Sequence, residues 1–192
     1  MRHRLIIGFP MVIFTTGLSL LLTFMLNSPL YGAEQKDPLS ALRVVKFENK
    51  IEAPNFSSTN PDGQPISVKD FRGKVVLMNF FATWCTPCLA ELPQMDKLYQ
   101  TYKDKGFVIL GVSLDVQGEE VVKPFMKEMG LTFPAVLDSE GKVARLYGLR
   151  GLPSSYLIGR QGEAIGLIMG FRDWTSEDAH KMVEFLLKNS QD

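Results

Sequence analysis

The sequence predicts an α/β fold in which helices cover both faces of a buried sheet. Two near-continuous apolar runs, at residues 75–81 and 107–114, are typical of strands that are covered on both sides. Each run is followed by a segment whose apolar residues have helical spacing. Because strands that alternate with helices build layered α/β domains, these observations together predict that class.

Before the first buried strand, the chain predicts a short β-hairpin. Its turn is Asn60-Pro61-Asp62-Gly63, a combination of residues that favours turns. The preceding residues 34–40 are polar and contain Pro38, so we expect a linker there. We assign residues 1–33 to an amino-terminal segment, residues 34–48 to the linker and the start of the domain, and residues 49–192 to the domain itself.

The remaining elements follow from the same periodicity. After Cys88, apolar residues recur at helical spacing as far as Tyr102, and Gly106 ends the helix. The later predicted elements are a helix at residues 119–129, strands at 133–137, 156–158 and 164–169, and a last helix that is capped by Thr175 and continues to Leu187.

The amino terminus has the pattern of an export signal. Arg2 and Arg4 precede an apolar run at residues 5–26. This run is closer in length to a membrane span than to the apolar region of a cleaved signal. Tyr31 also stands two residues before Ala33, where a cleavage site needs a small residue. We therefore expect an uncleaved anchor rather than a cleaved signal peptide.

The same segment predicts where the domain works. Its arginines stay on the cytoplasmic side, so the rest of the chain is exported. We expect the domain at the periplasmic or extracellular face of the cytoplasmic membrane, anchored by residues 5–26 or released after cleavage. No cysteine lies at residues 20–35, which excludes a lipid anchor on an amino-terminal cysteine. Disulfide chemistry is permitted in such a compartment.

Composition excludes several classes of function. The chain has 21 basic and 21 acidic side chains, and no basic stripe favours nucleic acid. Its two cysteines and two histidines cannot supply four zinc ligands near the cysteine pair. We therefore predict no metal, no cofactor and no nucleic-acid partner. Further expectations are core or surface packing for Met95 and Trp174 rather than a cofactor site, solvated charges at Glu119-Glu120 and Arg172-Asp173, and no catalytic partner for His180.

The strongest chemical signal is the sequence FFATWCTPC, which ends at Cys88. It places a C-x-x-C pair directly after a buried strand and at the start of a helix. Free backbone N–H groups there stabilise a thiolate, which can lower a cysteine pKa from about 8.5 to about 3.5–7.5. We expect Cys85 to be the exposed nucleophile and Cys88 to be the resolving thiol. A purely structural disulfide is the alternative, although so short a loop adds only about 2 kcal/mol of stability.

Motifs around the cysteine pair extend this pattern over residues 50–170. They are APNF at 53–56, GKVV at 73–76, NF at 79–80, WCTPC at 84–88, ELP at 91–93 and GLP at 151–153. Together they resemble the thioredoxin superfamily, and within it the TlpA/ResA-like branch of membrane-tethered, extracytoplasmic thiol–disulfide reductases. The resemblance implies the thioredoxin fold of AhpC/TSA-type redoxins, with a central mixed β-sheet, flanking helices and an N-terminal β-hairpin extension.

The resemblance also implies a substrate-binding surface. Pro153 matches the cis-proline that faces the cysteine pair in this superfamily, and the backbone of Leu152 would pair with a substrate chain. An ordinary loop proline is the alternative for Pro153. Trp84 would shield the cysteine pair and offer a flat contact surface, and simple packing is the alternative for it. Thr86 would tune the reduction potential, and Pro87 would fix the first helical turn.

Acid–base chemistry is implied for Glu91, which matches an acidic residue near the active site of TlpA/ResA-like proteins. Its carboxyl group, one turn beyond Cys88, would relay protons to the leaving thiolate, unless Glu91 is a surface residue of the helix. Cytoplasmic thioredoxins carry a buried aspartate six residues before the first cysteine, where this chain has Asn79. Because an amide does not exchange protons at neutral pH, this role would pass to Glu91, a bound water or the substrate.

The implied partners are protein thiols and disulfides, for example the haem-attachment cysteines of apocytochrome c, and an upstream membrane electron donor. The resemblance points to reduction of partners, while the sequence does not fix the potential of the cysteine pair. Residues 53–85 also resemble peroxiredoxins, yet Thr83 is not three residues before Cys85 as a P-x-x-x-T-x-x-C motif requires. A Sco-like copper protein is a further alternative, but the cysteine spacing is one residue too short and His180 lies in the last predicted helix.

Overall fold

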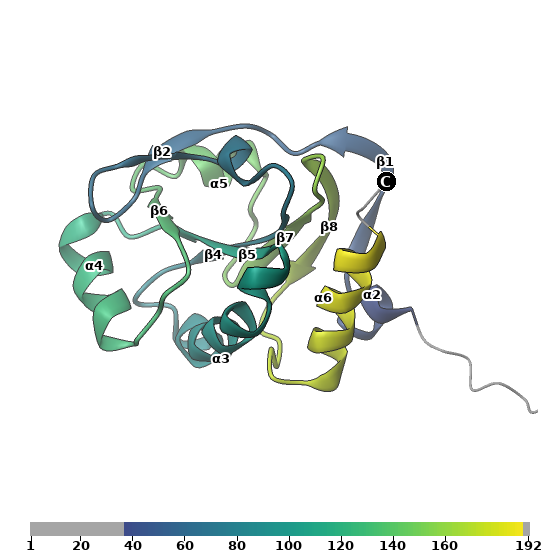
Figure 1. The fold of residues 1–192 in the computed structure, drawn as a ribbon. Helices are drawn as coiled ribbons and strands as arrows, with labels where there is room; N and C mark the ends of the chain where they lie inside the picture. The colour runs from purple at the N-terminus through teal and green to yellow at the C-terminus, as the bar shows by residue number, and fades with distance from the viewer. Residues whose placement is uncertain (1–36, 190–192) are drawn as a thin grey trace, which may run out of the picture. The chain divides into compact units, whose positions relative to one another are not determined.

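Residues 37–189 are described by the structure, a computed structural model (Figure 1). The expected anchor at residues 5–26 and the boundary at residue 33 lie outside these residues. Within residues 37–189, none of the helices combines the length and the apolar character that crossing a membrane requires.

A six-stranded mixed sheet forms the centre of the domain. Its strands, in spatial order, are β1 (Val45–Glu52), β8 (Glu163–Met169), β7 (Ser154–Ile158), β4 (Val75–Phe81), β5 (Phe107–Ser113) and β6 (Ala135–Leu137). Strands β4, β5 and β6 are parallel, whereas β7 and β8 run antiparallel to their neighbours. The predicted strands at 75–81 and 107–114 are confirmed, and they pair side by side along their whole length.

Helices cover both faces of this sheet, as predicted (Figure 1). Along β4, the side chains of Leu77 and Phe81 enter one core, whereas those of Met78 and Phe80 enter the other. The first core is closed by α3 (Thr86–Tyr102), α4 (Glu119–Glu128), α6 (Glu177–Asn189) and α2 (Pro38–Ala41), and the second by α5 (Lys142–Leu146) and the 3-10 helix η1 (Val68–Phe71). Each fully buried Leu or Phe contributes about 1.5–3 kcal/mol.

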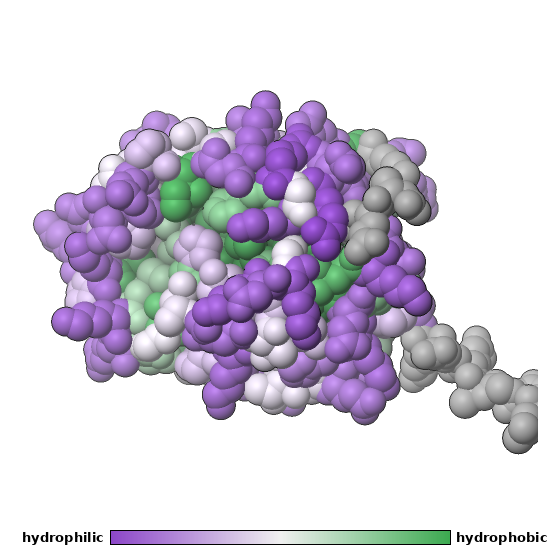
Figure 2. Space-filling model, viewed as in Figure 1, coloured by the Kyte–Doolittle hydropathy of each residue, from purple (hydrophilic) through white to green (hydrophobic). Residues whose placement is uncertain are grey.

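The predicted hairpin is present before β4. It consists of β2 (Ser57–Thr59) and β3 (Pro65–Ser67), with Thr59 paired to Pro65. The Asn60 Oδ1 atom accepts hydrogen bonds from the backbone N–H groups of Asp62 and Gln64, which fixes the turn. Hydrophilic residues cover most of the face shown in Figure 2, and apolar residues show in the hollows between them.

The linker expected at residues 34–40 is wrong for its last residues. Asp37 caps the short helix α2 by accepting a hydrogen bond from the N–H of Leu39, and Pro38 occupies the first turn. Leu39 is buried in the core that α6 closes. The segment is polar apart from Leu39, and Leu39 and the following Leu42 both pack into this core.

The last helix begins one residue later than its predicted cap implies. Ser176, not Thr175, caps it, because the Ser176 Oγ atom accepts a hydrogen bond of 3.3 Å from the N–H of Ala179. The hydroxyl of Thr175 instead donates to Asp173. Strand β1 and helix α5 were not predicted, since β1 is half exposed and α5 has only five residues.

Candidate active site

Cys85 stands at the point where the sheet passes into a helix. Strand β4 ends at Phe81, and the N–H of Cys85 donates to the carbonyl of Ala82 at 3.1 Å, which closes a tight turn. Helix α3 starts at the next residue, and within the described chain the Cys85 side chain makes no capping hydrogen bond. The free N–H groups of the first turn therefore remain near the cysteine, where they favour a thiolate.

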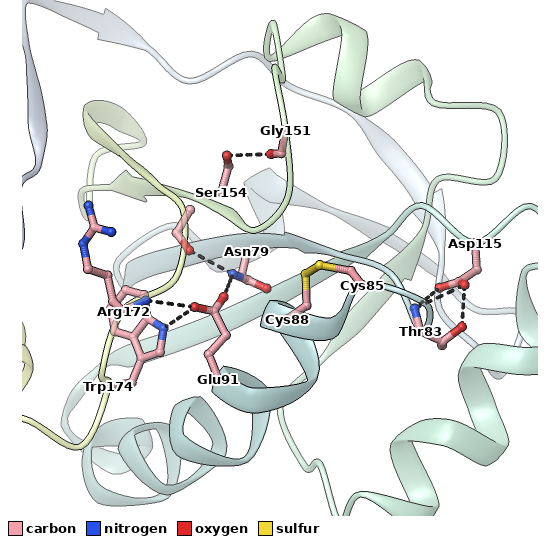
Figure 3. Close-up of a disulfide and its surroundings, with 11 residues drawn as sticks. Asn79, Thr83, Cys85, Cys88, Glu91, Asp115, Gly151, Ser154, Arg172 and Trp174 are labelled. Atoms are coloured by element: carbon pink, nitrogen blue, oxygen red, sulfur yellow. Dashed lines mark hydrogen bonds between the residues drawn. A yellow bond between two sulfur atoms is a disulfide. The ribbon is translucent and has the colours of Figure 1, made fainter.

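Cys85 and Cys88 form a disulfide with a Cα–Cα distance of 5.3 Å (Figure 3). The two cysteines differ in accessibility: Cys85 is 6% exposed and Cys88 is fully buried. A partner can therefore approach only the first sulfur from outside. Cys85, expected to be exposed, is mostly buried but more accessible than Cys88; the roles of nucleophile and resolving thiol stay a prediction.

A shallow, mostly apolar groove borders Cys85. Its other walls are Trp84, Thr86, Pro87, Leu114, Leu149, Gly151 and Leu152. Four of the five residues expected at the substrate-binding surface thus lie together. Trp84 is 69% exposed, so its ring is available for contact rather than packed in the core. The groove provides an apolar surface directly beside the more accessible sulfur of the disulfide.

The fifth expected residue, Pro153, is buried behind the groove wall. The peptide bond between Leu152 and Pro153 is cis, as the resemblance implies. The Ser154 hydroxyl donates to the carbonyl of Gly151 at 2.8 Å, which ties this loop together before β7 begins. Pro153 itself is not among the groove residues; Leu152 is the residue of this pair that reaches the groove.

Glu91 lies in the interior, so its interpretation as a surface glutamate is wrong. It is only 1% exposed. Its carboxyl oxygens accept hydrogen bonds from Asn79 Nδ2 at 3.1 Å, Trp174 Nε1 at 3.2 Å and the Arg172 backbone N–H at 3.3 Å. Asn79 also donates to the Ser155 hydroxyl at 3.0 Å. Figure 3 shows this cluster beside the Cys88 end of the disulfide.

Burial raises the pKa of Glu91 above its ordinary value, because removal from water disfavours the charged form. The hydrogen bonds from Trp174, Arg172 and Asn79 oppose this effect without cancelling it. A carboxyl group with a raised pKa can hold and release a proton nearer neutral pH. Glu91 is thus suited to proton exchange one helical turn from Cys88.

Two residues of this cluster differ from their sequence-based interpretation. Trp174, expected to pack in the core or on the surface, is buried in the core, and its ring N–H also bonds to Glu91. Arg172, expected to be a solvated charge, is half-buried, and its Nε atom donates to the carbonyl of Leu42. Burial of a polar group requires a partner, and the partners come from segments that are distant in sequence.

His180 does not join the site. Its Nδ1 atom lies 3.0 Å from the hydroxyl of Tyr102, which also donates to Glu184. This contact joins α3 to α6 and involves no residue of the cysteine cluster, so it gives His180 no catalytic partner. The contacts of His180 and Tyr102 therefore help to hold these two helices together.

Sequence reasoning missed Asp115, which lies on the other side of the disulfide from Glu91 (Figure 3). Its carboxylate accepts hydrogen bonds from the backbone N–H and the hydroxyl of Thr83. One signal was available: Ser113 and Phe81 end two paired parallel strands, so residues just after them must meet.

A redox-active cysteine pair at a helix start, on a mixed sheet with helices on both faces, defines a thiol–disulfide oxidoreductase. Comparison with known proteins agrees. Residues 50–164 match the model of the AhpC/TSA family. The chain is 43% identical over 125 residues to the thiol-disulfide oxidoreductase ResA of Bacillus thuringiensis subsp. konkukian, covering 65% of this chain and 72% of that protein.

Solved structures give the same result. A thiol:disulfide interchange protein of the thioredoxin family from Chlorobium tepidum superposes with a TM-score of 0.65 at 31% identity, covering 73% of this chain and 99% of that one. StoA from Bacillus subtilis superposes with a TM-score of 0.57 at 29% identity, covering 71% and 98%. The chain belongs to the ResA-like thiol–disulfide oxidoreductases of the AhpC/TSA family.

Proposed function

We propose that this protein is a membrane-anchored reductase of disulfides in exported proteins, and that it acts through a mixed disulfide on Cys85. The observation that carries the proposal is the asymmetry of the cysteine pair. Cys85 reaches the surface at a helix start and opens onto an apolar groove, whereas Cys88 is fully buried. Such a pair can engage a partner with one sulfur and release it with the other.

In the first step, the reduced protein binds the partner chain against the groove. The thiolate of Cys85 attacks one sulfur of the partner's disulfide. A bond forms between Cys85 and that sulfur, the partner's S–S bond breaks, and the other partner sulfur leaves as a thiolate. Trp84 and Leu152, which line the groove together with Cys85, would hold the partner chain during this attack.

In the second step, the thiol of Cys88 loses its proton and its sulfur attacks the Cys85 sulfur. The Cys85–Cys88 disulfide forms and the partner leaves as a dithiol, so two electrons have passed from the protein to the partner. We assign the transfer of the Cys88 proton to Glu91. Its buried carboxyl group lies one turn along α3, and its raised pKa suits proton exchange.

The partner class follows from the groove and the expected location. An apolar groove beside a single reachable sulfur suits an extended polypeptide better than a small polar thiol. The haem-attachment cysteines of an exported apocytochrome c are such a substrate. The dithiol form would be restored by a membrane electron donor, with residues 5–26 holding the domain at the membrane surface.

The experiment is partner trapping in cells with the full-length Cys88→Ala variant. It removes the resolving thiol, so mixed disulfides should accumulate on Cys85 and be released by a reductant. Cys85→Ala is the matched control and should trap nothing. Trapping through Cys88 in that control, or recovery of trapped partners only from the cytoplasm, would overturn the proposal. A reductase also requires a potential nearer about −270 mV than about −120 mV.

A further inference from the structure

Asp115 forms a buried polar cluster of its own beside the active site. It is 1% exposed and lies just after β5. Its carboxylate accepts a hydrogen bond of 3.0 Å from the N–H of Thr83, one of 2.6 Å from the Thr83 hydroxyl and one of 2.8 Å from the Ser113 hydroxyl. A single buried acceptor group therefore holds two chain segments together.

One of these segments is the turn that presents the nucleophile. Thr83 lies within the turn that the Cys85 N–H closes on Ala82, so a fixed Thr83 fixes the entry into α3. The other segment forms part of the substrate surface. Leu114 lines the groove, and Val116 is 78% exposed. The hydrogen bonds of Asp115 thus fix the position of this groove wall relative to Cys85.

The charge of Asp115 has a second consequence. A carboxylate disfavours a further negative charge nearby, and burial weakens the screening of this repulsion by water. The N-terminus of α3 stabilises a thiolate on Cys85, and Asp115 opposes that effect from the other side of the turn. The reduced form of the pair contains this thiolate. When the thiolate is stabilised less, the reduced form becomes less favourable relative to the disulfide, and the pair becomes a better reductant.

We propose that Asp115 is a positioning residue for Cys85, which locks the turn at Thr83 to the groove wall and keeps the cysteine pair reducing through its negative charge. This inference rests on the proposed function, since the direction of electron flow gives the charge its purpose. It concerns a residue that makes no contact with the partner in the proposed exchange and that acts on Cys85 through Thr83 and through its charge.

Three variants of the full-length, detergent-solubilised protein test it. Asp115→Asn keeps the shape and removes the charge. Thr83→Val keeps the charge and removes one hydrogen bond. Asp138→Asn is the matched control, because Asp138 is another buried carboxylate, which bonds instead to the N–H groups of Val143 and Ala144 in α5. The readouts are the thiol pKa of Cys85 from pH-dependent alkylation, the equilibrium with glutathione, and the rate of reduction of a disulfide-bonded peptide.

The charge predicts opposite results for the first two variants. In Asp115→Asn, the pKa of the Cys85 thiol should fall by about half a unit to one unit, and the equilibrium should move three- to tenfold towards the dithiol, which is about 15–30 mV. In Thr83→Val, that pKa should stay or rise while peptide reduction slows several-fold. Asp138→Asn should match the wild type. The other charges around the site, those of Glu91, Arg150 and Arg172, are identical in all variants.

The inference is wrong if Asp115→Asn leaves the thiol pKa and the glutathione equilibrium unchanged, or if Asp138→Asn shifts them equally. Should Asp115→Asn not fold, Thr83→Val decides, and wild-type rates of peptide reduction in it would contradict the positioning role. Failure of the proposed function would give a different result, because the wild type itself would not reduce the peptide. The pKa of Cys85 in the wild type could still be compared with that in Asp115→Asn.

Discussion

At the scale of a residue, burial changes the acid–base properties of Glu91. Its carboxyl group is buried beside Cys88, where three N–H groups hold it in place. The partners come from two separate parts of the chain: Asn79 from β4, and Arg172 and Trp174 from the segment between β8 and α6. Burial in this folded surrounding is what raises the pKa of Glu91, while the three hydrogen bonds oppose the rise.

Glu91→Gln should remove the proton carrier while keeping an acceptor oxygen in the cluster. We expect reduction of a disulfide-bonded peptide at pH 7 to slow by about 10²-fold, the lower end of the usual contribution of acid–base catalysis. Stopped-flow measurement across pH 4–9 checks this. Exposed Glu119→Gln on α4 is the control. An unchanged rate and pH profile in Glu91→Gln would exclude the proton-transfer role.

The same group predicts how stability depends on pH. Since the pKa of Glu91 is higher in the folded than in the unfolded state, the folded protein binds more protons between the two values. Glu91 should make its largest contribution to the free energy of unfolding below its unfolded-state pKa of about 4.3. This contribution should be lost as the pH rises through the folded-state pKa. Urea titrations should show this fall in the wild type and lack it in Glu91→Gln. A fall of equal size in the variant would assign the effect to other groups.

At the scale of the element, helix α2 is a small piece with a structural role. It is four residues long, and an isolated helix of that length is not stable in water. Its order comes from the Asp37 cap and from Leu39, which is 5% exposed in the core closed by α6. The segment that composition assigned to a linker thus belongs to the folded domain.

Leu39→Ala should lower the free energy of unfolding by about 2–3 kcal/mol, through lost burial and the cavity left behind. The alkylation rate of Cys85 should stay at the wild-type value, because α2 makes no part of the groove. Ser40→Ala, at an exposed position of the same helix, is the control. A stability change below about 0.5 kcal/mol in Leu39→Ala would mean that the segment is a linker after all.

At the scale of the whole molecule, the sequence predicted what depends on local pattern. The strands at 75–81 and 107–114, the hairpin turn and the C-x-x-C pair at a helix start could all be read from periodicity and turn residues. The resemblance to TlpA/ResA-like proteins supplied Pro153 and Glu91. Neither periodicity nor composition carried information on β1, which pairs with β8 more than a hundred residues away.

The other contacts of the site could not be predicted from periodicity or composition, because they form only when distant segments pack together. Arg172 reads as a surface charge until the fold brings its backbone N–H to Glu91. Asp115 reads as a loop residue until two parallel strands end together and place it against Thr83. Both are polar residues whose partners lie more than thirty positions away in sequence, a separation at which spacing alone predicts no contact.

At the scale of the whole molecule, the account centres on the cysteine pair, and the pH dependence of its alkylation tests the account most directly. The reduced full-length protein is treated with limiting iodoacetamide between pH 4 and 10, and the modified cysteine is located by mass spectrometry. We predict that Cys85 reacts first and ionises below the free-cysteine value of about 8.5. First reaction at Cys88, or ionisation of Cys85 at or above about 8.5, would contradict the account.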